Sequence, residues 1–214
     1  MLTGVLISVI PALICITFHE LSHGFVAYKL GDPTAKRMGR LTLNPIKHID
    51  VFGLLMMVVF RFGWAKPVPV NMMSFKHPKR YMALTALAGP ASNIILAIIT
   101  LLIYGLTYTA LGGRQTLETA GGIALLMIER LAQISVALAV FNIIPIPPLD
   151  GSKVLFSVVS DKLYYKLMKY ERYGMILLIL VVSTSVFSST VGRATSFLYE
   201  KLFVAAEAMH KLVN

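Results

Sequence analysis

The sequence predicts an all-α integral membrane protein with about four transmembrane helices, and three observations support this fold class. Of the 214 residues, 57% are hydrophobic and only 14% are charged. In soluble domains about a quarter of the residues are charged. The mean hydropathy of the chain is +0.74. Several apolar runs also reach the roughly 20 residues that a helix needs to cross a bilayer.

Four spans are expected, and the first three each have a recognisable end. The first is followed by the turn Gly31-Asp32-Pro33, the second by Gly112-Gly113, and the third by a cluster of prolines. The first run is too long for a signal-peptide core and lacks a basic start, so we expect it in the mature protein. We expect one intramembrane domain over residues 1–214, with spans at about 2–30, 81–111, 121–146 and 173–191.

Three segments outside these spans have predicted structures of their own. Asp50 to Phe62 contains the apolar run VFGLLMMVVF, which is too short to cross and predicts a re-entrant or interfacial hairpin. WAKPVPVN, residues 64–71, predicts an extended edge strand, because proline restricts the residue before it to extended conformations. After the last span, Arg193 to Asn214 predicts an amphipathic surface helix.

Polar residues interrupt the third span, and two interpretations remain open for them. Glu129, Arg130 and Gln133 either lie at the outer interface, where the helix begins, or line a polar cavity. Glu129 and Arg130 are adjacent, so they do not face each other on a helix.

The formal net charge of +10 indicates membrane topology, not nucleic-acid binding, because the basic residues gather in two blocks between apolar runs. Ten Lys and Arg residues lie between Lys29 and Arg80, and five lie between Lys153 and Arg172. The positive-inside rule places both blocks in the cytoplasm and therefore both termini outside. The lipid bilayer is an expected partner and nucleic acid is not.

The first span contains the pattern H-E-x-x-H at His19, Glu20 and His23. Residues i and i+4 share one face of a helix, so both imidazoles can reach one zinc ion, with Glu20 beside them as general base. Titratable groups are costly in a membrane span, which makes a chance match improbable. Cys15 lies four residues before His19, as a possible inhibitory thiolate or as a small buried side chain.

A catalytic zinc site needs a third protein ligand, and Asp150 is the best candidate. It follows Pro145, Pro147 and Pro148, which break the helix, and Gly151 permits a turn back toward the metal. An Asp-Gly pair after prolines is equally compatible with a simple turn. Asp50 is the only serious rival, because its depth is unknown.

HELSHG at residues 19–24, GPASN at 89–93 and NIIPIPPLDG at 142–151, in this order, resemble the site-2 protease family of intramembrane zinc metalloproteases. GRLTLNPIKHID at residues 39–50 and AKPVPVN further resemble its compact branch, which lacks PDZ and CBS domains. The resemblance implies one zinc ion per chain, held by His19, His23 and Asp150, with Glu20 as base. It also implies cleavage of a transmembrane protein substrate near its cytoplasmic side, whereas no accessory module is evident.

Several further residues have two interpretations. Asn93 and Asn142 either stabilise the oxyanion of the tetrahedral intermediate, as the resemblance implies, or form hydrogen bonds between helices. His48 is expected near the mouth of the site, and His77 and His210 at the interface.

Three functional hypotheses follow from these residues. The first is a zinc endopeptidase acting in or near membrane helices, with WAKPVPVN as an edge for an extended substrate. The alternative is a metal-ion transporter or sensor that uses His19, His23 and Asp150 as a transit site, but such a protein has no need of Glu20. A catalytically idle scaffold is disfavoured by the intact motifs. The oligomeric state stays open.

Overall fold

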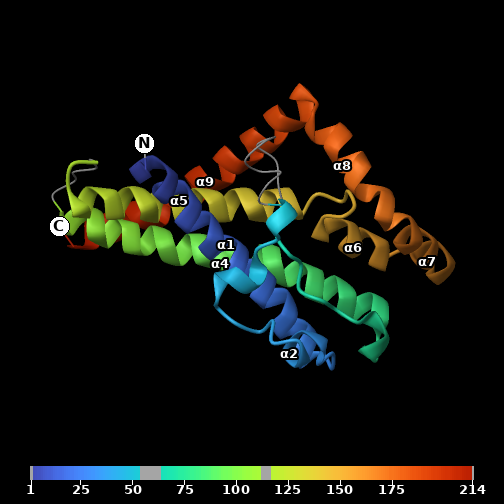
Figure 1. Cartoon of the computed structure of the whole chain (residues 1–214). Coiled ribbons are helices and arrows are strands. Elements are labelled where there is room, and N and C mark those ends of the chain that lie inside the picture. Colours follow the sequence, from blue (N-terminus) through green and yellow to red (C-terminus); the bar gives the residue numbers. More distant parts are fainter. Residues whose placement is uncertain (1, 54–63, 112–116, 214) are drawn as a thin grey trace. The chain divides into compact units, whose positions relative to one another are not determined.

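The computed structural model describes residues 2–53, 64–111 and 117–213, and the regular secondary structure in this part of the chain is helical (Figure 1). These residues contain no strand, only an isolated antiparallel bridge between Ile49 and Ala65. The α-helices are α1 (Leu2–Lys29), α2 (Thr34–Arg37), α4 (Pro78–Ala110), α5 (Ala120–Asn142), α6 (Asp150–Ser157), α7 (Asp161–Tyr170), α8 (Gly174–Val182) and α9 (Ser185–Val213). Short 3-10 helices lie at Pro45–His48, Met72–Ser74 and Glu171–Tyr173.

Three of these helices are long and apolar enough to cross a membrane: α1 from Leu6 onward, α4 and α5. Large apolar side chains point outward along them, for example Phe25, which is 51% exposed, and Ile95, which is 57% exposed. Outward-facing apolar residues at this density are expected where lipid is the solvent. The all-helical class is therefore confirmed, and three helices that could serve as membrane spans lie near the first three predicted ones.

The third and fourth spans differ from the predicted ones at their ends. α5 stops at Asn142, four residues before the predicted end, because the residues that precede Pro145 and Pro147 are restricted to extended conformations. The predicted fourth span is interrupted, since α8 ends at Val182 and α9 begins at Ser185. Thr184 accepts a hydrogen bond from the Phe187 amide at 3.3 Å, which favours a new helix start. Within the described residues, a fourth span exists only if the bent pair Asp161–Val182 and Ser185–Ala208 is counted as one.

Two predictions about local structure remain predictions. The re-entrant hairpin falls largely on residues 54–63, outside the described residues. The C-terminal segment is helical but belongs to the longer α9, and its attachment to a membrane surface stays a prediction.

The predicted edge strand at residues 64–71 forms the single bridge at Ala65 and no ladder.

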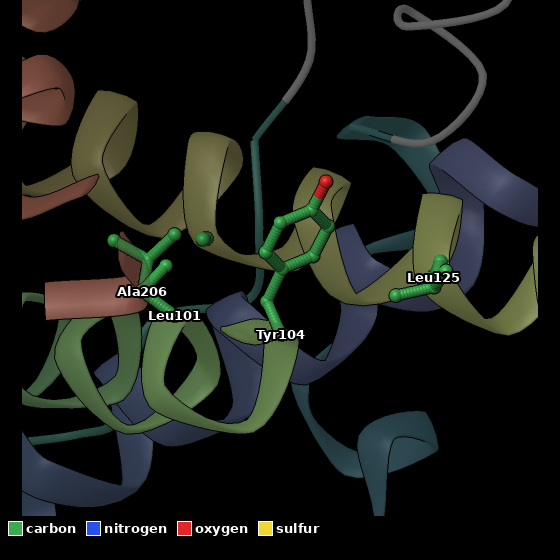
Figure 2. Close-up of a cluster of buried hydrophobic side chains, with 5 residues drawn as sticks. Leu101, Tyr104, Leu125 and Ala206 are labelled. Atoms are coloured by element: carbon green, nitrogen blue, oxygen red, sulfur yellow. The ribbon is translucent and has the colours of Figure 1, made fainter. Parts of the chain in front are cut away.

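The chain divides into two compact units. Unit 1 comprises Met1–Cys15, Asn93–Phe141 and Val182–Asn214, and unit 2 comprises Ile16–Ser92 and Asn142–Val181. The core of unit 1 is a cluster of buried side chains from α4, α5 and α9 (Figure 2). Its members are Leu101, Tyr104, Leu125, Ala132 and Ala206.

The polar residues of α5 lie within unit 1 and form a short chain of hydrogen bonds. Gln133 donates to Glu129 at 3.0 Å and accepts from Arg130 at 2.8 Å. Arg130 and Gln133 line a cavity of about 350 Å³ together with Thr195 and Tyr199 of α9. This arrangement favours the polar-cavity interpretation over a helix start at the interface.

Unit 2 holds the end of α1 and the connection that follows it. Gly31 ends the helix with φ of +107°, a left-handed conformation that glycine adopts without strain. Asp32 is fully buried and accepts hydrogen bonds from the Thr34 amide at 3.0 Å and the Asn71 amide at 2.6 Å. The carboxylate therefore ties the end of α1 to the segment at residues 64–71.

Two further bonds hold the same segment. The Lys66 amide donates to the His48 carbonyl at 2.9 Å, and the Lys66 carbonyl accepts from Arg40 at 2.8 Å. The segment is thus held along much of its length by residues that precede it in the chain.

Candidate metal centre

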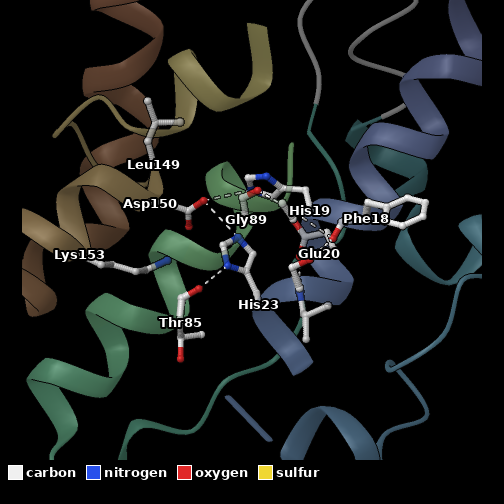
Figure 3. Close-up of polar contacts among 12 residues, drawn as sticks. Phe18, His19, Glu20, His23, Thr85, Gly89, Leu149, Asp150 and Lys153 are labelled. Carbon is white, nitrogen blue, oxygen red and sulfur yellow. Dashed lines mark hydrogen bonds and ion pairs between the residues drawn. The ribbon is translucent and has the colours of Figure 1, made fainter. Parts of the chain in front are cut away.

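Two imidazoles of α1 form the first half of the site. His19 and His23 are one helical turn apart, and their ring centroids lie 4.6 Å from each other with the rings perpendicular (Figure 3). Both side chains are buried. Because residues i and i+4 lie above one another on a helix, the two Nε2 atoms point toward the same space.

Asp150, the first residue of α6, completes the cluster. Its Oδ2 atom lies 3.1 Å from Nε2 of His19 and 3.1 Å from Nε2 of His23. The three side chains offer ligand atoms that all lie within 4.8 Å of one another, a separation that one metal ion can bridge. Among the described residues, this is the group of metal-ligating side chains found at such distances.

The turn that delivers Asp150 requires glycine at the next position. A Cβ atom on Gly151 would lie 2.0 Å from the Ile143 carbonyl oxygen, which no side chain tolerates. Gly151 therefore permits the proline-rich stretch after α5 to fold against the start of α6. The sequence attributed this glycine to a turn, and the structure adds the close contact that demands it.

A second glycine allows α4 to pass directly beneath the imidazoles. A Cβ atom on Gly89 would lie 2.5 Å from Nε2 of His23 and 2.6 Å from Cε1 of His19. The sequence placed Gly89 in the stretch GPASN, but it did not indicate that this glycine packs against the two histidines.

The hydrogen bond made by Nδ1 of His23 shows which of its two ring nitrogens carries a proton. Nδ1 lies 2.7 Å from the Thr85 carbonyl oxygen of α4, and since a carbonyl only accepts, Nδ1 carries a hydrogen and donates it. In neutral His23, Nε2 then presents its lone pair to the carboxylate of Asp150. Two acceptors at 3.1 Å need a positive charge between them, which either a proton or a metal cation supplies. The donor set therefore fits a divalent metal ion.

The carboxyl of Asp150 responds strongly to this environment. Burial by itself raises its pKa, but the hydrogen bonds with His19 and His23 outweigh burial and hold the pKa well below its usual range. Asp150 is consequently an anion at neutral pH, the state in which a carboxylate coordinates metal.

Glu20 stands beside this cluster without belonging to it. Its Oε2 atom accepts a hydrogen bond from the Val68 amide at 2.7 Å, so the carboxylate is held by the backbone of the segment at residues 64–71. Neither this amide nor the Thr85 carbonyl could be identified from the sequence, because every residue except proline carries the same backbone groups.

The remaining predicted residues are placed as follows. Asn93 is fully buried in α4, and Asn142 is the last residue of α5; the structure does not decide between their two interpretations. Cys15 is buried with its Sγ atom 3.0 Å from Ser135 Oγ, as expected for a packed side chain. His48 is also buried and donates from Nε2 to the Thr42 carbonyl at 2.9 Å. His77 is exposed, whereas His210 contacts Thr109 at 2.7 Å.

Comparisons with known proteins point to one family. Residues 115–186 match the model of peptidase family M50. The chain is 41% identical over 176 residues to "Putative zinc metalloprotease YwhC" of Bacillus subtilis (strain 168), covering 82% of this chain and 80% of that protein. It is 30% identical over 186 residues to "Putative zinc metalloprotease Rip2" of Mycolicibacterium smegmatis, covering 85% and 68% of the two chains. No solved structure matches.

Replacing Gly89 by alanine tests the close approach of α4. The added methyl group must displace the rings of His19 and His23, so we expect Gly89→Ala to weaken zinc binding about 10- to 100-fold, as disturbed supporting residues do at other metal sites. Zinc affinity of the purified protein is the measurement. Gly192→Ala in α9 is the matched control, because a Cβ atom there meets nothing within 4 Å. Equal affinity in both variants would contradict the geometry.

Proposed function

The chain belongs to peptidase family M50 and is a zinc metalloprotease, and from this premise we propose that it hydrolyses peptide bonds in or near transmembrane segments of membrane proteins. The proposal rests on the meeting of His19 and His23, which lie on a helix apolar enough to span a bilayer, with Asp150 at the start of the short helix α6. A protease built this way works on substrates that reach it from within the membrane.

We propose that these three residues hold one zinc ion per chain. Two imidazole nitrogens and one carboxylate oxygen are ligands that zinc accepts, and three protein ligands leave one position open. The negative charge of Asp150 offsets part of the metal charge in a buried site, which neutral ligands alone could not do. When bound, zinc lowers the pKa of a coordinated water to about 7 and polarises the substrate carbonyl.

Glu20 acts as the general base in this proposal. The Val68 amide holds Oε2 of the carboxylate, and the other oxygen takes the proton from the attacking water. The water oxygen bonds to the scissile carbon, the carbon–nitrogen bond breaks, and Glu20 passes the proton to the leaving amine. Support for this role comes from the position of Glu20 next to His19 and from its hydrogen bond outside the ligand cluster.

The residues around the cluster keep these groups in place. The bond between His23 Nδ1 and the Thr85 carbonyl sets the tautomer that leaves Nε2 free for a metal, and such outer partners typically orient metal-binding histidines. Asn93 and Asn142 are candidates for stabilising the oxyanion, and hydrogen bonding between helices is the alternative for both.

A peptide bond inside a helix is shielded by its own hydrogen bonds, so the substrate must unwind locally before cleavage. The segment at residues 64–71 is the proposed edge for the unwound chain, because its Val68 amide donates a hydrogen bond to Glu20. The positive-inside rule further places the site near the cytoplasmic face and both termini outside.

Metal transport is not favoured as a second function. The described residues provide one cluster of three metal-ligating side chains, whereas a transport path requires binding sites at several depths. Glu20 also has no task in transport, whereas it has one in hydrolysis.

Changing Glu20 to glutamine distinguishes a role in catalysis from a role in zinc binding. Glutamine keeps the size and a hydrogen-bond acceptor for the Val68 amide but cannot take a proton, so proteolysis should fall by about a hundredfold to ten-thousandfold. Zinc content, measured by elemental analysis of the same preparation, should remain normal. A fully active Glu20→Gln protein would refute the proposed base.

Asp150 is tested through the metal itself. Asp150→Ala should lose most of the bound zinc together with activity, because the only anionic ligand is removed. Asp150→Asn should still hold zinc weakly through its neutral carbonyl oxygen. The control is Asp50→Ala, since Asp50 accepts a hydrogen bond from Gly53 outside the cluster and should leave the metal in place. Normal zinc in Asp150→Ala would move the third ligand elsewhere.

Orientation in the membrane is tested with single cysteines in a Cys15→Ser background. Cysteines at the exposed positions Lys36 and Lys162 should react with an impermeant maleimide only from the cytoplasmic side, because both lie in basic segments. A cysteine at the exposed position Leu117 should react only from outside. The reverse labelling pattern would invert the topology and the side of cleavage.

A further inference from the structure

A cavity at the start of α4 has no task in the peptide hydrolysis proposed above. Its volume is about 640 Å³, and its lining residues come from the start of α4, from α6 and from α7, all within unit 2. His19, His23 and Asp150 are not among these residues, so the cavity is distinct from the metal centre.

One end of this cavity is positively charged. Lys76, Lys79 and Arg80 line it, against a single carboxylate, that of Asp161. Lys79 is 3.0 Å from Asp161 and also donates to the Val159 carbonyl, so this pair neutralises itself. Lys76 and Arg80 are exposed, and within the described ranges no ion pair involves either of them. Two cations are therefore available to an anionic ligand.

The other end of the cavity is apolar. Leu84 and Leu87 follow Arg80 on the same face of α4, and they are 42% and 36% exposed. Val154 of α6 adds a further apolar side chain. The lining thus changes from cationic to apolar within about two turns of one helix.

The position of this change along α4 matches a membrane boundary. No charged residue occurs between Arg80 and the end of the helix at Ala110, a length that exceeds the roughly 30 Å of a hydrocarbon core. Lys and Arg at the end of such a run typically mark the interface with the headgroups. The first turn of α4 also contains no acidic residue that would repel an anion.

We propose that this cavity binds one anionic phospholipid. Lys76 and Arg80 hold the phosphate, to which the guanidinium group can donate two parallel hydrogen bonds, and an acyl chain lies along Leu84 and Leu87. Lipid is favoured over a free phosphate because a small anion would leave the apolar half of the cavity without a contact. The lipid would contact both α4, which carries Thr85 and Gly89, and α6, which begins with Asp150.

The test measures lipid binding and does not depend on peptidase activity. The full chain is purified in detergent, and bound dioleoylphosphatidylglycerol is counted by native mass spectrometry as the lipid is titrated. Lys76→Gln/Arg80→Gln should weaken binding roughly tenfold or more, since each cation near an anionic lipid contributes about 1 kcal/mol. Lys162→Gln/Lys166→Gln is the matched control, because it removes two exposed charges from α7 that do not line the cavity.

Two further titrations distinguish the possible occupants. Dioleoylphosphatidylcholine should bind at least several-fold more weakly than the anionic lipid, and millimolar inorganic phosphate should not displace bound lipid. Equal binding of both lipids would overturn the proposed anionic site, and displacement by phosphate would make it a site for free phosphate. Equal loss in the two double variants would also overturn the proposal, because it would show a general charge effect.

Discussion

The contact between the Asp150 carboxylate and the two imidazoles constrains much of the surrounding structure. Oδ2 lies 3.1 Å from Nε2 of both His19 and His23, and all three residues are buried. Such a cluster is stable only if its charges balance and its rings stay oriented. This requirement accounts for the close approach of α4 at Gly89, for the Thr85 carbonyl facing His23, and for the tight turn at Gly151.

A second constraint acts from the connection between α1 and α4. Two carboxylates accept hydrogen bonds from the backbone of one segment, Glu20 from the Val68 amide and Asp32 from the Asn71 amide. Asp32 is fully buried, so its bonds replace hydration that the carboxylate has lost. These two hydrogen bonds fix the position of residues 64–71 against the C-terminal half of α1, and they hold the carboxylate of Glu20 beside this segment. A substrate that binds along this segment would thereby be aligned with the proposed base.

Charged and polar groups in this chain occur where the structure can compensate for them. Glu129, Arg130 and Gln133 bond to one another along α5, and two of them border a cavity. Lys79 and Arg80 lie in the first turn of α4, and no other charged residue follows them as far as Ala110, a pattern that is typical of the boundary between headgroups and hydrocarbon. Both arrangements follow from the high cost of isolated charge in hydrocarbon. The same cost makes the three polar residues of the metal centre informative about function.

The sequence by itself determined the helical membrane class, three of the spans, and the group of residues from which the candidate metal centre is built. These features depend on local patterns: apolar length identifies a span, and the spacing of His19 and His23 places them on one helical face. Asp150 could be nominated because prolines and Gly151 mark a turn at the end of a span. Its role as a ligand, like that of Glu20 as a base, is a proposal on which sequence and geometry agree.

Only the tertiary structure decided which groups support these residues. The Thr85 carbonyl is 62 positions from His23, and the Val68 amide is 48 positions from Glu20. Backbone groups are chemically alike at nearly every residue, so no pattern in the sequence distinguishes the two that face the site. The break between α8 and α9 was missed for a related reason, because Ser and Thr are tolerated within helices and become helix starts only in a suitable context. The spacing of residues within one helix can be read from the sequence, whereas contacts between distant segments depend on how the whole chain packs.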